Sequence, residues 1–309
     1  MEASDQEKAA VELAGLVETT DFPSVSFGPV AHALCHLISS SNRTVACFSA
    51  RALKILVTDD SLRVQVGVTG VSRVVISAIK RWEEEVLCVR ELLGILQTLC
   101  WDRHGVSSLT NPEIISYLIG YIQASDDEVN VLALCTIANI LYYSDTISFE
   151  DTNTSFEMSK AMPILLRTVR MTAHRSIRFY SMTAIANACA HPVFSKILID
   201  HDALDVCEDQ ARQGKNNSSI FGSRLVEVAH SARLALSNSQ DIEDVGERNR
   251  SATLSGGSEK YHFKWGKEPA MRVSFEYPSQ AKANSLLIAL LIWGGIIMWT
   301  FFPAFNASA

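Results

Sequence analysis

The side chains best suited to chemistry in this chain are its histidines and cysteines, and two histidines have a spacing that could hold a metal. His32 and His36 lie one helical turn apart, with Cys35 beside them. Zinc sites in proteins take four such ligands. No second ligand pair is visible, and the surrounding residues form an apolar helical pattern. We therefore interpret these histidines as helix-packing residues and predict no metal site.

Catalytic patterns are also missing from the sequence. His104 and His191 are expected in loops, near Asp102 and Cys189 respectively, but neither accompanies a nucleophile motif. There is no glycine-rich phosphate loop, H-E-x-x-H or G-x-S-x-G segment. The acidic run 83–85 is interpreted as a solvated helix start, where negative charge is favourable. We predict a protein that is not an enzyme, with no catalytic or cofactor-binding residues and no cofactor.

The charge of the chain is acidic and unevenly distributed. Its 309 residues carry a net charge of −7. Residues 260–282 contain five Lys or Arg against two Glu, or +3, which leaves −10 for the rest. An acidic body argues against nucleic-acid binding. Seven cysteines without a C-x-x-C pair, and an N-terminus that resembles neither a secretory signal nor a mitochondrial presequence, favour reduced thiols in a cytosolic domain.

Internal repetition is the main structural signal. Five helical segments share one apolar face, and aligning them gives spacings of 40, 44, 48 and 51 residues between Leu53, Leu93, Ile137, Ile185 and Leu236. Such periods are near those of stacked helical repeats. A second block lies between these segments. Its clearest copy is 62–79, in which Gly70 is expected to break the chain between two helices by adopting a positive φ.

Weaker copies of this second block follow. In the copy 111–122, Asn111 is expected to take the glycine's conformation, whereas the copies 161–169 and 202–207 have neither Gly nor Asn at the break. Capping boxes are predicted at Ser4–Glu7, opening an N-terminal helix within 1–20, and at Ser125–Glu128, opening a long helix.

The order of a short helix, glycine, a second helix and a long third helix with Ala-Leu-x-Asn resembles the armadillo repeat, with HEAT-like units as the open alternative. The resemblance covers residues 26–238 and implies an all-α, right-handed superhelical solenoid. It also implies that the third helices line a concave groove. There, asparagine side chains would bind the backbone of an extended peptide.

The groove positions of the resemblance are occupied by Ile55, Ile95, Asn139, Asn187 and Asn238. We therefore predict an asparagine ladder formed by the last three residues. The alternative is that these amides bond neighbouring helix ends inside the stack. Importin-like members carry tryptophan one turn earlier. Here that position holds no tryptophan in any repeat, so nuclear import is not expected.

The C-terminal segment is predicted to cross a membrane. Residues 285–305 are apolar and uncharged, and their length of about 21 residues is near the ~20 that a spanning helix needs. A polar linker, 239–284, precedes the span. Aromatic and cationic side chains on both sides suit the membrane interface; they are Lys260, Lys264, Trp265, Lys267, Trp299, Phe301 and Phe302. Because no positive charge follows the span, the body should face the cytosol. The endoplasmic reticulum is favoured over the mitochondrial outer membrane.

The sequence thus predicts a tail-anchored, single-pass membrane protein that acts as a non-catalytic interaction scaffold or adaptor. Its partner would be a protein that places an extended peptide or a helix in the groove. The alternatives are a membrane-bound chaperone-type regulator and an accessory subunit of a membrane complex.

Overall fold

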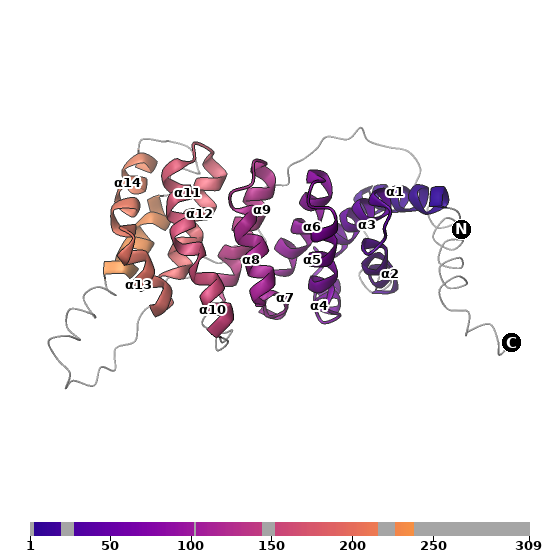
Figure 1. Cartoon of the computed structure of the whole chain (residues 1–309), viewed down its shortest axis with the longest axis horizontal. Helices are drawn as coiled ribbons and strands as arrows, with labels where there is room; N and C mark the ends of the chain where they lie inside the picture. Colours follow the sequence, from indigo (N-terminus) through magenta and orange to yellow (C-terminus); the bar gives the residue numbers. More distant parts are fainter. Residues whose placement is uncertain (1–2, 20–27, 102, 144–151, 216–225, 238–309) are drawn as a thin grey trace. The chain divides into compact units, whose positions relative to one another are not determined.

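The computed structural model describes residues 3–19, 28–101, 103–143, 152–215 and 226–237. In these ranges every regular element is a helix (Figure 1), which confirms the all-α prediction. Residues 226–237 are helical as well. The labelled helices are α1 (Ala3–Thr19), α2 (Gly28–Ile38), α3 (Arg43–Leu56), α4 (Asp60–Gly67), α5 (Val71–Arg81), α6 (Val86–Leu99), α7 (Arg103–Leu109), α8 (Pro112–Tyr121), α9 (Asp127–Tyr142), α10 (Thr152–Ser159), α11 (Ala161–Met171), α12 (Arg175–Ala188), α13 (Pro192–Asp200) and α14 (Ala203–Lys215).

The helices form successive three-helix repeats. Helices α4, α5 and α6 make one repeat, α7–α9 the next and α10–α12 a third, while α13, α14 and the helix 226–237 follow the same order. The third helix of each repeat packs on the third helix of its neighbour: α3 on α6, α6 on α9 and α9 on α12. Helix α1 packs on α3 and continues the row at its N-terminal end (Figure 1).

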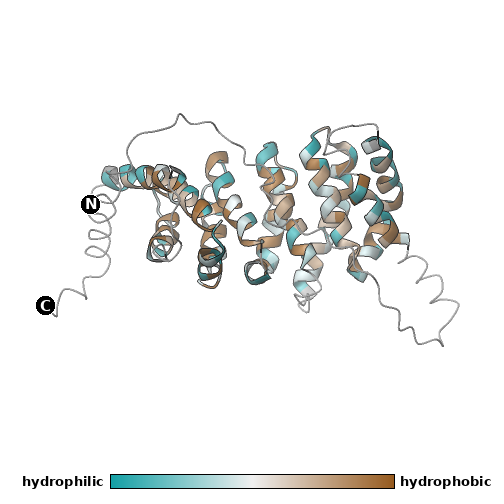
Figure 2. Cartoon of the chain, turned by 180° about the vertical axis from the view of Figure 1, so that it is seen from behind, coloured by the Kyte–Doolittle hydropathy of each residue, from teal (hydrophilic) through white to brown (hydrophobic). Residues whose placement is uncertain are grey.

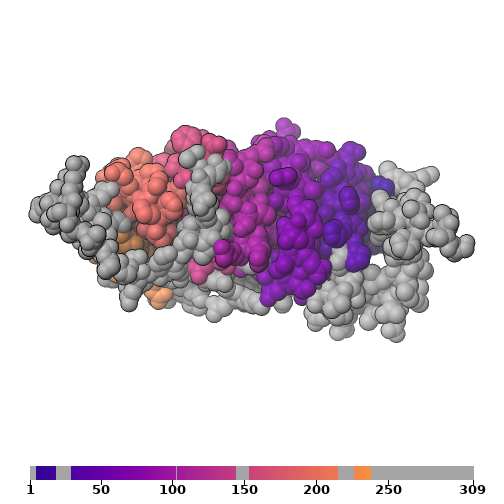
Figure 3. All heavy atoms as spheres, turned by 90° about the horizontal axis from the view of Figure 1, so that it is seen from below, coloured from indigo at the N-terminus to yellow at the C-terminus, as the bar shows by residue number. Residues whose placement is uncertain are grey.

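A single hydrophobic core runs through all of these repeats, from Ala14 in α1 to Leu236 in the last helix. Helix α5 shows how the sequence produces it, because Val71, Val75 and Ile79 recur every four residues and are buried, whereas Arg73 is exposed. Apolar and polar stretches alternate along most helices (Figure 2), and successive helices follow one another in sequence order in the space-filling view (Figure 3). Each repeat therefore depends on its neighbours for burial.

Gly70 makes the predicted break. Its φ is 77°, a left-handed conformation, and α4 and α5 differ in direction by 79° on its two sides. The prediction for Asn111 is wrong, because this residue is extended (φ −115°) and caps α8, its side-chain oxygen accepting a hydrogen bond from the Glu113 amide. Asp202 instead adopts the left-handed conformation, with φ 59°, in the copy that has neither Gly nor Asn.

The predicted capping boxes are also corrected. Asp126, and not Ser125, is the N-cap of α9, and its carboxylate accepts a hydrogen bond of 3.0 Å from the Val129 amide. A carboxylate accepts this bond more strongly than a hydroxyl does. Ser4 lies inside α1, which already begins at Ala3.

Several predictions concern residues outside the described ranges. They are the groove position Asn238, the linker 239–284, the span 285–305 and the interface residues assigned to the last two segments. Among the helices that are described, none is by itself both long and apolar enough to cross a bilayer.

Candidate functional site

The third helices bring four of the five predicted groove positions into neighbouring repeats. Ile55 lies on α3, Ile95 on α6, Asn139 on α9 and Asn187 on α12. The two asparagine side chains are almost completely covered, with exposed fractions of 7% for Asn139 and 3% for Asn187. These four positions therefore lie on successive third helices, and the two amide side chains are largely buried.

Asn187 has a structural role. Its side-chain nitrogen donates a hydrogen bond of 2.8 Å to the carbonyl oxygen of Ala138, in the third helix of the preceding repeat. This contact corresponds to the alternative in which the amides bond neighbouring helices inside the stack. The side-chain oxygen of Asn187 is buried and bonds no donor in the described part of the chain. Buried acceptors without a donor are uncommon, so one half of this amide is available for a further hydrogen bond.

Ion pairs join the third helices of successive repeats. Arg43 of α3 pairs with Glu85, which occupies the N-cap position of α6, at an N–O distance of 2.7 Å. Lys54 of α3 pairs with Glu91 of α6. Between α9 and α12, Nε2 of His174, the N-cap of α12, lies 4.0 Å from the Asp127 carboxylate, a contact that is an ion pair only when the histidine is protonated. Most of these groups are partly exposed, so each isolated pair contributes little to the folding free energy.

The pair between α6 and α9 has the most specific geometry. Arg90 donates from Nε to the Asp126 carboxylate at 3.0 Å, donates from Nη2 to the second oxygen, and also pairs with Glu128 at 3.0 Å. The hydrogen bond from Arg90 lowers the pKa of Asp126. Because Asp126 also caps α9, one carboxylate holds both the start of this helix and its contact with the preceding repeat.

The contact between α3 and α6 is unusually close at Gly94. A Cβ atom added there would lie 2.4 Å from Cδ of Lys54, so a larger residue would require the Lys54 side chain to move. Nearby on the same pair of helices, the Cys88 thiol donates a hydrogen bond to the sulfur of Cys47, which lowers the pKa of Cys47. Burial acts in the opposite direction on Cys35, raising its pKa to about 11.

The histidines have structural surroundings. His104 lies in α7, which corrects the loop prediction, and the ring of His191 stacks on Phe194 with 4.4 Å between the ring centroids. Partial burial lowers the pKa of His191. Within the described ranges, no group of three or more His, Cys, Asp or Glu side chains is placed to hold a metal ion.

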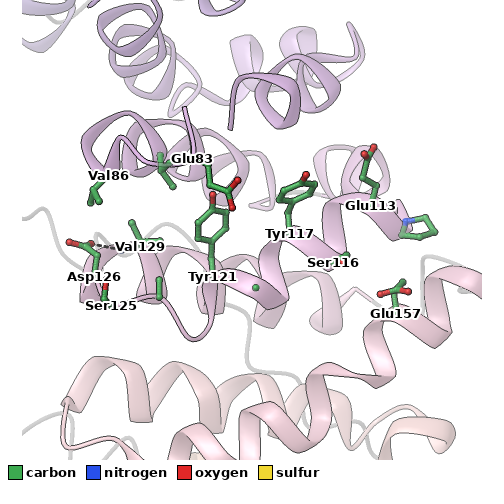
Figure 4. Close-up of a pocket in the computed structure, with 14 residues that line it drawn as sticks. Glu83, Val86, Glu113, Ser116, Tyr117, Tyr121, Ser125, Asp126, Val129 and Glu157 are labelled. Carbon is green, nitrogen blue, oxygen red and sulfur yellow. Dashed lines mark hydrogen bonds between the residues drawn. The ribbon is translucent and has the colours of Figure 1, made fainter. Parts of the chain in front are cut away.

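The structure adds a cavity that the sequence did not indicate. It has a volume of about 750 Å³ and follows the exposed side of α8, the second helix of its repeat (Figure 4). Its floor is a helical stripe with a spacing of three and four residues: Glu113, Ser116, Tyr117, Gly120, Tyr121 and Ala124. The α5–α6 turn, the start of α9 and Glu157 of α10 provide the walls. The sequence did not indicate this cavity because its walls come from three other elements. The stripe of residues spaced three and four apart on α8 could be recognised from the sequence alone.

Four carboxylates line this cavity, and three of them already have cationic partners. Glu113 pairs with Lys80, Asp126 with Arg90, and Glu157 with Lys160 at 2.6 Å. Glu83 makes no ion pair with any described residue. It faces the ring of Tyr121 (Figure 4), whose hydroxyl is buried and bonds no described partner. Burial, with a smaller effect of the Glu83 charge, raises the pKa of Tyr121 to about 12.

Comparison with known proteins identifies the fold. No model of a known protein family matches the chain, and no curated protein matches its sequence. Among solved structures, an engineered protein of the Northeast Structural Genomics Consortium is similar over 77% of this chain and 93% of its own, with a TM-score of 0.64 and 16% identity. A designed armadillo repeat protein is similar over 76% and 94%, with a TM-score of 0.63 and 14% identity.

A third similar structure is a designed armadillo repeat protein in complex with the peptide (KR)4. It matches 74% of this chain and 92% of its own, with a TM-score of 0.61 and 14% identity. Identities this low establish the fold alone. The chain therefore has the armadillo-like repeat fold, which confirms the resemblance drawn from its sequence.

Proposed function

We propose that this protein is a non-catalytic interaction scaffold that binds an extended segment of a partner protein along its third helices and is held at a membrane by residues 285–305. The observation that carries the binding proposal is the half-satisfied amide of Asn187. Its nitrogen is engaged by Ala138, while its buried oxygen bonds no described donor. A backbone N–H of a bound peptide is the donor that this oxygen lacks.

The row of third helices supports the same proposal. Their stacking places Asn139 and Asn187 in adjacent repeats, so one extended peptide could meet both amides in turn. The designed armadillo repeat protein bound to (KR)4 shows that this fold accepts a peptide. Since Asn139 and Asn187 are almost covered, binding here requires side chains around them to move, and we expect slow association.

The binding proposal is tested by comparing substitutions of buried asparagines at groove positions with one at another position. Peptides are first selected from a displayed random library against the full-length protein in neutral detergent, and the Kd of one is measured by fluorescence anisotropy. We expect Asn139→Ala and Asn187→Ala each to weaken it by about tenfold, the equivalent of ~1.4 kcal/mol. Asn130→Ala is the matched control. Asn130 is also buried on α9 and donates a hydrogen bond of 2.6 Å to the Ile122 carbonyl, but it is not at a groove position.

The control separates binding from stability. All variants are compared at a temperature where circular dichroism shows each to be folded. Peptide binding along the third helices is refuted if Asn130→Ala lowers the peptide affinity as much as the groove variants do. It is also refuted if the groove variants bind the peptide as tightly as the unchanged protein.

The membrane proposal rests on the composition of residues 285–305, which carry no charge, and on the preceding cationic and aromatic residues. Deleting residues 284–309 should release the protein from the membrane fraction into the soluble fraction of a cell lysate. A deletion variant that still sediments with membranes would show that the tail is not its anchor.

A further inference from the structure

The α8 cavity is a second candidate binding site, on different residues from the third-helix positions. None of Ile55, Ile95, Asn139 or Asn187 lines it. Its floor belongs to a second helix, and its volume of about 750 Å³ is within the ~300–1,000 Å³ typical of ligand pockets. The inference below goes beyond the proposed function and does not depend on it.

Glycine keeps the floor of this cavity open. A Cβ atom added at Gly120 would meet no atom within 4 Å, although tyrosines lie one and three positions away on α8. Gly120 is the second-to-last residue of α8, where a helical glycine is less favourable than alanine by at most the ~1 kcal/mol of a helix interior. Nothing in the packing of Gly120 requires glycine, since its φ is not positive and its surroundings are empty. The missing side chain leaves space beside the two tyrosine rings.

The charged side chains that line the cavity favour a cationic ligand. Every ionisable side chain that lines it, apart from the tyrosines, is a carboxylate. Lys80, Arg90 and Lys160 offset three of these from outside, which leaves Glu83 as the carboxylate without a described counterion. Two acceptors therefore converge on one region, the Glu83 carboxylate and the Tyr121 hydroxyl oxygen (Figure 4).

One of the two tyrosine rings already contacts a positively charged group. The ammonium group of Lys80 lies 5.3 Å from the centroid of the Tyr117 ring, in the range of a cation–π contact. Apolar side chains at the α6 end of the cavity, Val86 and Val89, suit the methylene stem of a long basic residue. Val86 is 43% exposed, so this edge is open to a partner.

We propose that the α8 cavity binds an arginine side chain presented by a peptide segment of a partner protein. The guanidinium would donate to Glu83 and, once the side chains that cover it move, to the buried Tyr121 hydroxyl, while its plane rests on a tyrosine ring in the space beside Gly120. Arginine suits this arrangement better than lysine because its planar fork of donors reaches two acceptors at once and stacks on aromatic rings.

The experiment measures binding of a fluorescein-labelled octapeptide of alternating arginine and alanine to the full-length protein in neutral detergent, by fluorescence anisotropy. Gly120→Leu occupies the space beside the two tyrosine rings, where the guanidinium would lie, and should weaken binding more than about tenfold. Glu83→Gln should weaken it about five- to tenfold, since a hydrogen bond to a charged group contributes more than one to an amide. Glu83 is on the surface, so this variant should fold even if Gly120→Leu does not.

Matched controls are present in the chain. Gly15→Leu makes the same change in α1, at a glycine whose added Cβ also meets no atom within 4 Å. Glu84→Gln removes the same charge from the neighbouring position, which does not line the cavity. Both should stay within twofold of the unchanged protein.

Three results would overturn the inference. Unweakened binding by folded Gly120→Leu would place the peptide elsewhere. Equal losses in Glu83→Gln and Glu84→Gln would reveal diffuse attraction to an acidic protein. An alternating lysine–alanine peptide that binds as tightly would refute the assignment to arginine.

Discussion

The side-chain nitrogen of Asn187 and the carbonyl oxygen of Ala138 are joined by a hydrogen bond of 2.8 Å that links the third helices of two adjacent repeats. These residues are 49 positions apart in the chain. The bond is buried, so water does not compete for either group. A residue predicted to serve a bound peptide thus also holds the stack together.

Replacing Asn187 by alanine should lower the free energy of unfolding by about 1–2 kcal/mol, because a buried hydrogen bond is lost and a small space is left. Urea denaturation followed by circular dichroism measures the change. Gln65→Ala, which removes an exposed hydrogen bond to Ser61, should change stability by less than ~0.5 kcal/mol. Equal effects of the two substitutions would contradict the structural role of Asn187.

The Arg90–Asp126 contact should make part of the free energy of unfolding depend on pH. The pKa of Asp126 is lower in the folded protein than its usual 3.8, so the pair stabilises the fold above that value. The stabilisation is lost as pH falls through the lowered pKa. Arg90→Met should therefore cost about 1 kcal/mol at pH 7, with the difference from the unchanged protein shrinking below pH ~4. A pH-independent difference in urea denaturation would be inconsistent with this origin.

Backbone conformation predicts opposite outcomes at two repeat breaks. Gly70→Ala should destabilise the protein by about 1–2 kcal/mol because alanine is strained at φ 77°. Asp202→Gly should stabilise it by about 0.5–1 kcal/mol because glycine relieves the strain at φ 59°. Thermal unfolding gives the sign of each change. Gly120→Ala serves as a reference. Because Gly120 occupies an open helical position, this substitution should raise the free energy of unfolding by about 0.5–1 kcal/mol.

Cysteine reactivity should differ between two half-buried thiols. The lowered pKa of Cys47 gives it more thiolate at pH 8 than Cys35, whose pKa is raised to about 11. Brief iodoacetamide treatment followed by peptide mass spectrometry should find Cys47 alkylated first. Cys88→Ala removes the hydrogen bond to the Cys47 sulfur and should slow its alkylation. Faster labelling of Cys35 would reverse this assignment.

Much of the fold could be predicted from the sequence because stacked repeats repeat their core pattern. Leu53, Leu93 and Ile137 recur at the same point of successive third helices, and all are buried. Gly70 was predictable because few residues other than glycine adopt its conformation. The roles of Asn111 and Asp202 were not predictable. Both residue types serve as N-caps and at positive φ, and the surrounding packing decides between these uses.

The candidate sites were less predictable because they depend on contacts across repeats. The sequence placed Asn139 and Asn187 on third helices, but it could not show how completely neighbouring helices cover them. The α8 cavity requires Glu83 to approach Tyr121 from another repeat. The available signal was the spacing of Tyr117, Gly120 and Tyr121, which puts two rings and a gap on one helix face.

The direction of the inter-repeat ion pairs has a consequence for how such a chain can lengthen. From α3 to α9, the earlier helix supplies the base and the later one the acid, as in Lys54–Glu91 and Arg90–Asp126. A tandem duplication of residues 60–99 would bring Glu85 and Glu91 of the second copy next to the helix that carries Arg90 of the first copy, so the new junction would keep this order of base and acid. Between α9 and α12 the order is reversed, with Asp127 preceding His174. The charge order of the first repeats is therefore compatible with lengthening by a copied α4–α6 repeat, and this order ends at α9.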